Sequence, residues 1–329
     1  MLSHLSISIS ISIAVPVKVM PLLTNKTITV DITSSAIRLL LASGDRVERW
    51  ADAYIEPGLV SDGIVTDAAE MGDRIIKLMK SSRIRGKKVM VSVSGLYSVS
   101  RLVNLPHPNG HSREEMMSDL IADIVPLSPE EFYTSWKIVG TNGNGHRALF
   151  FGTPINIIDS VLSSLKCASL KPAGLNLKSM ALLKLIDRQQ ALVANIEMDS
   201  ADIILIADAL PQVVRTIRRG MDVDMDEWVK DIETNMRQTI LFFNTRFGGR
   251  RLEPEAPLYL TGKLATDPAI AGELSELIGC PLDGLPVPLE CPPNMPTNQF
   301  AVNIGLAIKQ PHILPMIEHT DWEADDVEQ

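Results

Sequence analysis

The segment KTITVDITSSAIRLLL, Lys26 to Leu41, decides the fold of this 329-residue chain. Residues 27–32 are mostly β-branched, residues 36–41 are mostly apolar, and the small polar residues 33–35 lie between them. Two apolar runs joined by a short polar turn predict a β-hairpin. Asp31 lies at the end of the first strand, and a buried carboxylate without a partner costs several kcal/mol. We therefore expect Asp31 to face a partner or a cleft.

The same order of elements occurs twice along the chain. After the hairpin, the sequence predicts a third strand at 47–55, a helix at 67–80 and a further strand at 89–93. The second copy is expected to have strands at 191–197, 202–207 and 213–217, a helix at 224–247 and a strand at 258–261. Pro211 is expected to break the chain before the third of these strands. Two such copies imply two similar α/β lobes that face each other across a cleft, with both hairpins directed into it.

Five short motifs carry a resemblance to a known family. They are Pro57–Gly63, Arg101–Pro106, Ile124–Glu131, Ser169–Leu175 and Ala301–Ala307. Their residues and their order resemble the actin-like ATPase superfold, and within it the PilM-type pilus assembly proteins, which are relatives of the cell-division protein FtsA. The resemblance covers roughly residues 26–309. It implies an α/β, actin-like (ribonuclease H-like) two-lobed fold with an inserted α/β subdomain.

This resemblance also implies a domain organisation. We expect a first lobe at 24–190 with the inserted subdomain at 94–175, a second lobe at 191–298, a helix at 299–309 that returns to the first lobe, and an acidic tail at 310–329. Within the insertion we expect strand, helix, strand, strand and helix. The first of these helices is expected at 112–125, and the second after Thr153 as N-cap, with Pro154 at its first position.

The two ends of the chain have unusual compositions. Residues 5–13 alternate between an aliphatic residue and serine, without the basic region and continuous apolar run of a secretory signal. The alternation is compatible with an edge strand. We favour a natural start at Met20, because PilM-like chains begin a few residues before the first strand; residues 1–23 would then be a disordered or mis-annotated extension. The tail at 310–329 carries six carboxylates and is expected to be disordered.

The composition is typical of a soluble globular protein, with 45% apolar and 22% charged residues. A net charge of −9 argues against nonspecific binding of nucleic acid, which requires a basic face. The basic run at 81–88 is interpreted as a solvated loop near a helix C-terminus. His107 and His111 are four residues apart, but Pro108 and Gly110 between them exclude a helical metal site. No metal ligand is therefore assigned.

The resemblance implies where nucleotide would bind. Active members of the superfold hold Mg-ATP between the two hairpins and a glycine-rich turn, whose backbone N–H groups approach the phosphates closely. The family's first hairpin reads Asp-Ile-Gly-Ser and continues to a lysine. Here Asp31 and Ser34 remain, Thr33 replaces the glycine and Arg38 replaces the lysine. A β-branched side chain at this position is disfavoured at positive φ and crowds the phosphate.

The second hairpin departs further from the family. Asp-Ile-Gly has become Asn195–Glu197, which removes one carboxylate and places another beside the phosphate path. Two like charges about 4 Å apart repel by about 4 kcal/mol at an effective dielectric constant of about 20. That repulsion corresponds to roughly three decades of affinity. The third turn, usually Gly-Gly, is Gly262-Lys263 here.

We expect no catalytic residue, and either no cofactor or weakly bound ATP with Mg²⁺. Asp31 has an alternative interpretation as a turn residue whose oxygens accept nearby N–H groups. The candidate nucleotide ligands are Asp31, Thr33, Ser34, Asn195, Gly262 and Lys263.

The resemblance implies a scaffold as the leading function. PilM-type proteins bind the short N-terminal peptide of the membrane protein PilN, which places them in the cytoplasm at the inner face of the membrane within a pilus assembly complex. No nucleic acid and no direct membrane insertion are expected, and self-association is left open. The peptide groove is expected near strand 102–105 and helix 112–125. Residues 313–315 resemble the peptide that PilN offers and are a candidate to occupy that groove in cis.

Two other functions remain open at this point. The first is an active actin-like ATPase of the PilM/FtsA type that binds Mg-ATP. The second is a sugar or acetate kinase of the same superfold, which would need an acid in the cleft to activate its substrate. Both require the phosphate-binding glycines that the two hairpins lack.

Overall fold

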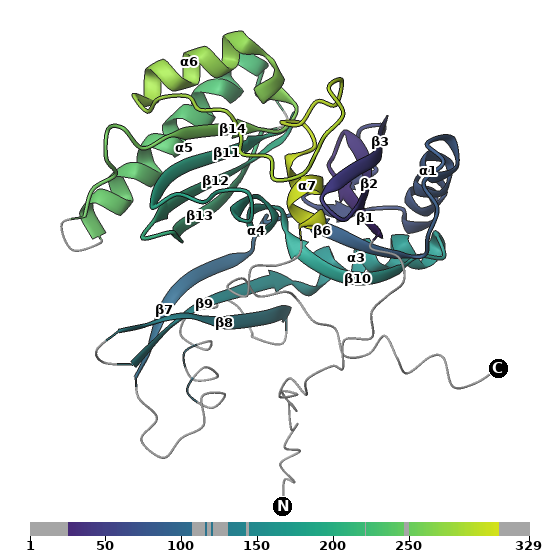
Figure 1. Cartoon of the computed structure of the whole chain (residues 1–329), viewed down its shortest axis with the longest axis horizontal. Coiled ribbons are helices and arrows are strands. Elements are labelled where there is room, and N and C mark those ends of the chain that lie inside the picture. The colour runs from purple at the N-terminus through teal and green to yellow at the C-terminus, as the bar shows by residue number, and fades with distance from the viewer. Residues whose placement is uncertain are drawn as a thin grey trace, which may run out of the picture.

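The computed structural model describes residues 26–106, 116, 120, 131–142, 145–220, 222–246 and 250–308. These residues form two α/β lobes and a separate three-stranded sheet (Figure 1). The expectations for residues 1–23, for the histidines at 107 and 111, and for the tail at 310–329 lie outside the described residues.

The first lobe is built on a five-stranded sheet with strand order β10-β6-β1-β2-β3. The hairpin and third strand predicted from the sequence are confirmed, and β6 runs parallel to β1. The fifth strand, β10, was not predicted from the sequence. The bounds are β1 (Lys26–Ile32), β2 (Ala36–Ser43), β3 (Arg46–Tyr54), β6 (Lys88–Val93) and β10 (Lys171–Leu177).

The second lobe has a four-stranded sheet with strand order β13-β12-β11-β14, which repeats the order β3-β2-β1-β6 of the first lobe. The predicted duplication is therefore confirmed. The expected chain break at Pro211 is wrong: Pro211 lies within β13 and pairs with Ile206, while Gln212 forms a bulge. A proline is tolerated there because β13 is an edge strand. The bounds are β11 (Gln190–Ile196), β12 (Ser200–Ala207), β13 (Leu210–Arg218) and β14 (Leu258–Thr261).

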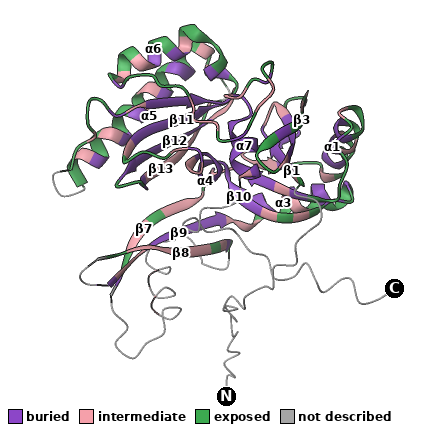
Figure 2. Ribbon diagram, viewed as in Figure 1, coloured by how far each residue is buried: buried purple, intermediate pink, exposed green. Residues whose placement is uncertain are grey.

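Helices cover the outer faces of both sheets (Figure 2). In the first lobe, α1 (Ala68–Ser81) and α3 (Ile155–Cys167) contribute to one core together with the sheet. Asp67 caps α1, accepting a hydrogen bond from the N–H of Glu70 at 2.9 Å. In the second lobe, α5 (Met225–Arg246) and α6 (Pro268–Ile278) cover the sheet. The apolar stripe of α5 is buried at Trp228, Ile232, Met236 and Phe243.

A second core connects the lobes. It contains α4 (Lys178–Leu183) and α7 (Ala301–Ala307), together with apolar residues of β2, β11 and β12. Every residue of α7 is buried, and it packs against β1, β2 and β6. At Gly305 the backbones of α7 and α4 are so close that an added Cβ would lie 2.0 Å from the carbonyl oxygen of Ala181. The two sheets are thus held by one shared core.

The insertion forms a three-stranded sheet with order β7-β9-β8, comprising β7 (Val99–Pro106), β8 (Phe132–Asn142) and β9 (Gly145–Pro154). At the end of the β8–β9 pair, Asn142 lies opposite Gly145. The expected N-cap at Thr153 is wrong, because Thr153 and Pro154 still belong to β9 and α3 begins at Ile155 without a side-chain cap. The hydroxyl of Thr153 instead bonds to that of Ser98 at 3.3 Å.

The helix expected at 112–125 lies mostly outside the described residues. Met116 and Leu120 are helical, and they pack against Leu105, Phe132 and Phe150 of the three-stranded sheet. In contrast, α3 packs into the first-lobe core with α1.

No helix in the described part of the chain is long and apolar enough to span a bilayer. Within the same ranges, no group of three or more His, Cys, Asp or Glu residues is arranged to hold a metal ion.

Candidate functional site

A buried ion pair joins the two lobes at the base of the cleft. Arg38 extends from β2 in the first lobe, and Glu197 follows β11 in the second lobe. Two hydrogen bonds connect them, from Nη1 to Oε1 at 2.6 Å and from Nη2 to Oε2 at 2.8 Å. Their side chains are only 1% and 2% exposed. This is the bidentate geometry in which a guanidinium and a carboxylate bind most strongly.

The charge of Glu197 raises the pKa of Arg38. Burial acts in the opposite direction, since it disfavours the charged guanidinium, but the adjacent carboxylate outweighs it. The structure differs here from the expectation that Glu197 would be a free negative charge beside the phosphate path. The two departures from the family's hairpins compensate each other, and the repulsion of about 4 kcal/mol calculated for a lone carboxylate does not describe this site.

Asp31 faces partners, as expected, and all of them come from the first lobe. Its Oδ1 accepts hydrogen bonds from the Ser92 hydroxyl at 2.5 Å, and the Lys178 amine lies 3.1 Å from the same oxygen. Arg38 approaches its Oδ2 at 3.3 Å. Burial would raise the pKa of Asp31, but the two cations and the hydroxyl together lower it. Lys178 also donates to the carbonyl of Ile32 at 2.7 Å.

The second hairpin contributes a matching cluster around Asn195 and Asp202. Asn195 donates to Asp202 at 3.2 Å and accepts from the Thr261 hydroxyl at 3.1 Å. The Asp202 carboxylate also accepts from Thr216 at 2.7 Å. Burial raises the pKa of Asp202, and these hydrogen bonds offset the rise only in part. The sequence did not indicate Ser92, Lys178 or Asp202, because none of them belongs to a motif.

The backbone donors of the first phosphate-facing turn are already occupied. The Thr33 hydroxyl accepts from the N–H of Ala36 at 2.9 Å and from that of Ser35 at 3.3 Å. A glycine at this position has no hydroxyl, so its turn would leave those N–H groups to a ligand. Thr33 therefore affects the turn through hydrogen bonding as well as through its bulk.

In the other two turns, main-chain carbonyl oxygens accept from the backbone donors. The N–H of Glu197 donates to the carbonyl of Ser200 at 2.9 Å, and that of Gly262 donates to the carbonyl of Asn298 at 2.9 Å. Gly262 has φ +89°, and a Cβ there would lie 2.5 Å from the carbonyl oxygen of Ile196, so only glycine fits. Of the remaining candidate ligands, Ser34 is partly exposed and Lys263 is exposed.

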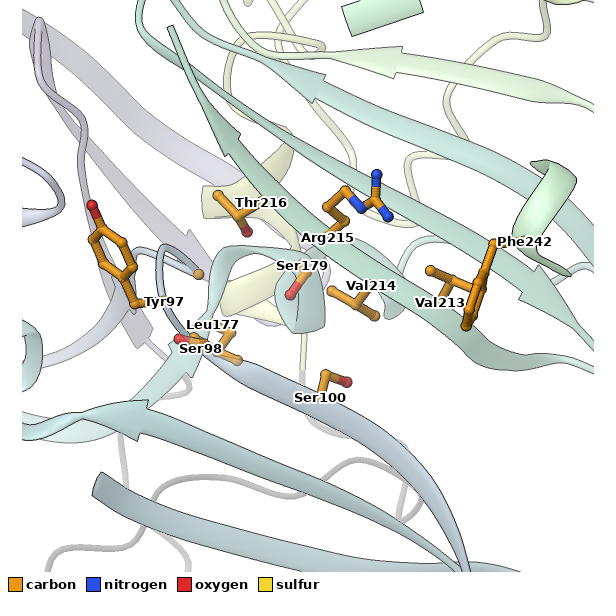
Figure 3. A pocket seen from close by; sticks show the side chains of 11 residues that line it. Tyr97, Ser98, Ser100, Leu177, Ser179, Val213, Val214, Arg215, Thr216 and Phe242 are labelled. Atoms are coloured by element: carbon orange, nitrogen blue, oxygen red, sulfur yellow. The ribbon is translucent and has the colours of Figure 1, made fainter. Parts of the chain in front are cut away.

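A pocket of about 420 Å³ lies between the lobes on another side of this cluster (Figure 3). It is flanked by β7 and β13, each of which is an edge strand of its own sheet. Ser98, Ser100 and Ser179 supply hydroxyl groups. The Ser179 hydroxyl is buried and has no hydrogen-bond partner among the described residues. The groove was expected further along β7, near 102–105, whereas this pocket adjoins the start of β7.

The geometry of two duplicated lobes around a central cleft agrees with solved structures. The chain has the actin-like ATPase fold. It is similar to a chain of a PilM–PilN type IV pilus biogenesis complex, with a TM-score of 0.71 and 21% identity over 85% of this chain and 97% of that one. It also resembles a protein from Bacteroides thetaiotaomicron with an actin-like ATPase fold, with a TM-score of 0.50 and 11% identity over 87% and 97% of the two chains.

The sequence comparisons add nothing to this result, since no protein-family model and no curated protein matches the chain. Within the actin-like fold, the cleft between the two hairpins is where Arg38 and Glu197 meet. Of the residues that the sequence singled out as nucleotide ligands, Asp31 contacts this ion pair directly, through Arg38.

Proposed function

We propose that the protein is a non-hydrolysing scaffold of a type IV pilus-like assembly machine. It acts in the cytoplasm at the inner face of the membrane, where it binds the N-terminal peptide of a PilN-like membrane protein. The observation that carries this proposal is the buried Arg38–Glu197 ion pair, which joins the lobes where ATPases of this fold hold Mg-ATP. The likeness to a chain of a PilM–PilN complex supports the choice of partner.

Binding of a triphosphate in this cleft would require the ion pair to separate. Removing one partner of a buried pair typically costs about 3–5 kcal/mol, because the other charge is left without compensation. Glu197 would then face the phosphates directly. The N–H groups of Ala36, Glu197 and Gly262, which would have to bind those phosphates, would also lose their present acceptors. These costs argue against the alternative function as an active ATPase.

The first test is a titration of the purified full chain with a fluorescent ATP analogue, with and without Mg²⁺. We expect no Mg²⁺-dependent binding at micromolar concentrations, since separating the pair weakens binding by about two to three decades. An actin-like ATPase of known activity serves as the positive control. Micromolar binding that requires Mg²⁺, followed by release of phosphate, would overturn the scaffold and favour the ATPase.

The pocket between β7 and β13 is our candidate for the peptide site. Edge strands present unpaired main-chain groups, and an extended peptide can add to them by strand pairing. The hydroxyl groups of Ser98, Ser100 and Ser179 offer further polar contacts, and Val214 and Phe242 provide an apolar wall (Figure 3). This arrangement suits a short extended segment with apolar side chains.

Filling this pocket should weaken peptide binding. We expect Ser100→Trp to weaken binding of a synthetic N-terminal peptide from a PilN-like protein of the same genome by at least about tenfold, because the indole occupies the space between the strands. Isothermal titration calorimetry measures the affinity. Ser163→Trp, at an exposed position of α3, is the matched control and should bind normally. Equal affinities for both variants would place the peptide elsewhere.

A further inference from the structure

A cluster of positive charge surrounds a second pocket, which lies at the end of α1 and has a volume of about 370 Å³. The basic cluster consists of Lys80, Arg83, Arg85 and Lys87, all of them exposed. The pocket floor between them is apolar and contains Met79, Ile84 and Leu170, which are 8%, 2% and 7% exposed. Figure 1 shows α1 and α3 on the side of the first lobe that faces away from the second lobe.

The charges of the basic cluster are not neutralised within the described part of the chain. No carboxylate lines the pocket, and none of the four side chains forms an ion pair with a described residue. Lys88, which is exposed at the start of β6, adds to the positive charge. Like charges gathered around one pocket repel one another. An anionic occupant would relieve that repulsion.

The chain itself contains a segment of matching chemistry. After α7 it continues to residue 329 and carries, from residue 310 onward, no lysine or arginine and the six carboxylates Glu318, Asp321, Glu323, Asp325, Asp326 and Glu328. Trp322 lies between two of these acidic residues. A tryptophan flanked by carboxylates complements an apolar floor that is rimmed by cations.

The length of the tail allows this contact. Ile308 is the last described residue and follows α7, which packs in the first lobe, so the tail starts from the lobe that carries the basic cluster. At about 3.3 Å per residue, Glu318 can reach roughly 30 Å and Glu328 roughly 65 Å from Ile308. A compact lobe of this size is roughly 40 Å across. Covalent attachment also gives the tail a high effective concentration at the cluster.

We propose that the acidic tail, residues 318–328, covers the basic cluster of the same molecule, with Trp322 seated on the apolar floor. The tail and the cluster then neutralise each other. This inference does not depend on the proposed function, because neither the cleft nor the peptide pocket contributes to it.

Zero-length crosslinking of the full chain tests the contact. A water-soluble carbodiimide joins a carboxylate to a lysine amine as an amide and takes up the released water as a urea. We expect crosslinks from the tail carboxylates to Lys80, Lys87 or Lys88, with the yield falling about fivefold between low and high salt as screening increases. Lys230 and Lys263, which are exposed in the second lobe, are internal controls. Equal crosslinking to these two lysines would overturn the proposal.

An equal mixture of unlabelled and ¹⁵N-labelled protein distinguishes a tail that belongs to the same molecule from a tail that belongs to a second copy. Crosslinks that form within one isotope population support a contact in cis. Crosslinks that join the two populations at the statistical frequency would overturn it in favour of a second copy of the chain.

Charge reversal provides a matched pair of variants. Arg83→Glu/Arg85→Glu keeps Lys80 and Lys87 as reporters, and the yield should fall at least about fivefold because the tail is now repelled. Arg246→Glu/Arg251→Glu, at exposed positions near the end of α5, should leave the yield unchanged. Thermal unfolding confirms that each variant is folded. An unchanged yield in the first variant contradicts the proposal.

Vesicles containing phosphatidylglycerol test the competing occupant, an anionic membrane. We expect the full chain not to sediment with them at low salt, and a variant with all six tail carboxylates changed to amides to sediment through the exposed cluster. If the unaltered chain binds these vesicles, and Arg83→Glu/Arg85→Glu abolishes that binding, the cluster is open to the membrane and the tail does not cover it.

Discussion

Glu197→Ala should lower the free energy of unfolding by about 3–5 kcal/mol, which is the usual effect of removing one partner from a buried ion pair. The variant leaves the Arg38 guanidinium buried, with the longer contact to Asp31 at 3.3 Å and the charge of Asp52 as partial compensation. Urea denaturation followed by circular dichroism measures the change. The double variant Arg38→Met/Glu197→Met should recover most of the loss, because no buried charge remains uncompensated.

An exposed ion pair supplies the control for this experiment. Glu56 is 64% exposed at its side chain and pairs with Arg74 on the surface of the first lobe. Glu56→Ala should change the stability by less than about 1 kcal/mol, since solvent screens such pairs. If Glu197→Ala were as mild as Glu56→Ala, the interlobe pair would contribute little to the fold.

Returning the family's residues to the cleft should create nucleotide affinity. The variant Thr33→Gly/Arg38→Lys/Asn195→Asp/Glu197→Gly removes the ion pair and frees the donors of the first turn. It should bind Mg-ATP about two to three decades more tightly than the unaltered chain, because binding no longer has to separate the pair. Titration with the fluorescent analogue measures this difference.

Thr33→Gly alone is the comparison that separates the two effects. It frees the N–H groups of Ser35 and Ala36 but keeps Arg38 and Glu197 paired, so it should gain little affinity. Tight binding by this single variant would show that the first turn, and not the ion pair, closes the cleft to nucleotide. If the fourfold variant gained no affinity for Mg-ATP, neither the first turn nor the ion pair would be what closes the cleft to nucleotide.

The fold was largely predictable because its signals are local and repeated. The hairpin at 26–41 and its counterpart at 191–207 each have a continuous apolar pattern and a short polar turn, which fix their pairing. The strand β10 was missed because Pro172 and Gly174 interrupt its pattern, and in the structure they coincide with a bulge. Pro211 misled the prediction for a related reason, since a bulge at an edge accommodates it.

The chemistry of the cleft was less predictable because it depends on distant residues. Arg38 and Glu197 are 159 positions apart, and only the packing of the two lobes brings them together. In the sequence, each residue was visible only as a separate replacement in one of the two hairpins, with nothing to show that they pair. The effect of Thr33 was expected from its bulk, whereas its hydrogen bonds to two N–H groups depend on the turn geometry. Lys178 lies at the start of α4, where no motif points to Asp31.

The shared core around α7 and α4 has a consequence for motion. Nucleotide-driven members of such a fold need a hinge about which one half swings relative to the other. In this chain the close backbone contact of Gly305 with Ala181 and the fully buried α7 bind both halves into one cooperative block. Rigid-body opening would expose buried apolar surface on both sheets at once. This shared core favours one arrangement of the two halves, in keeping with the proposed scaffold.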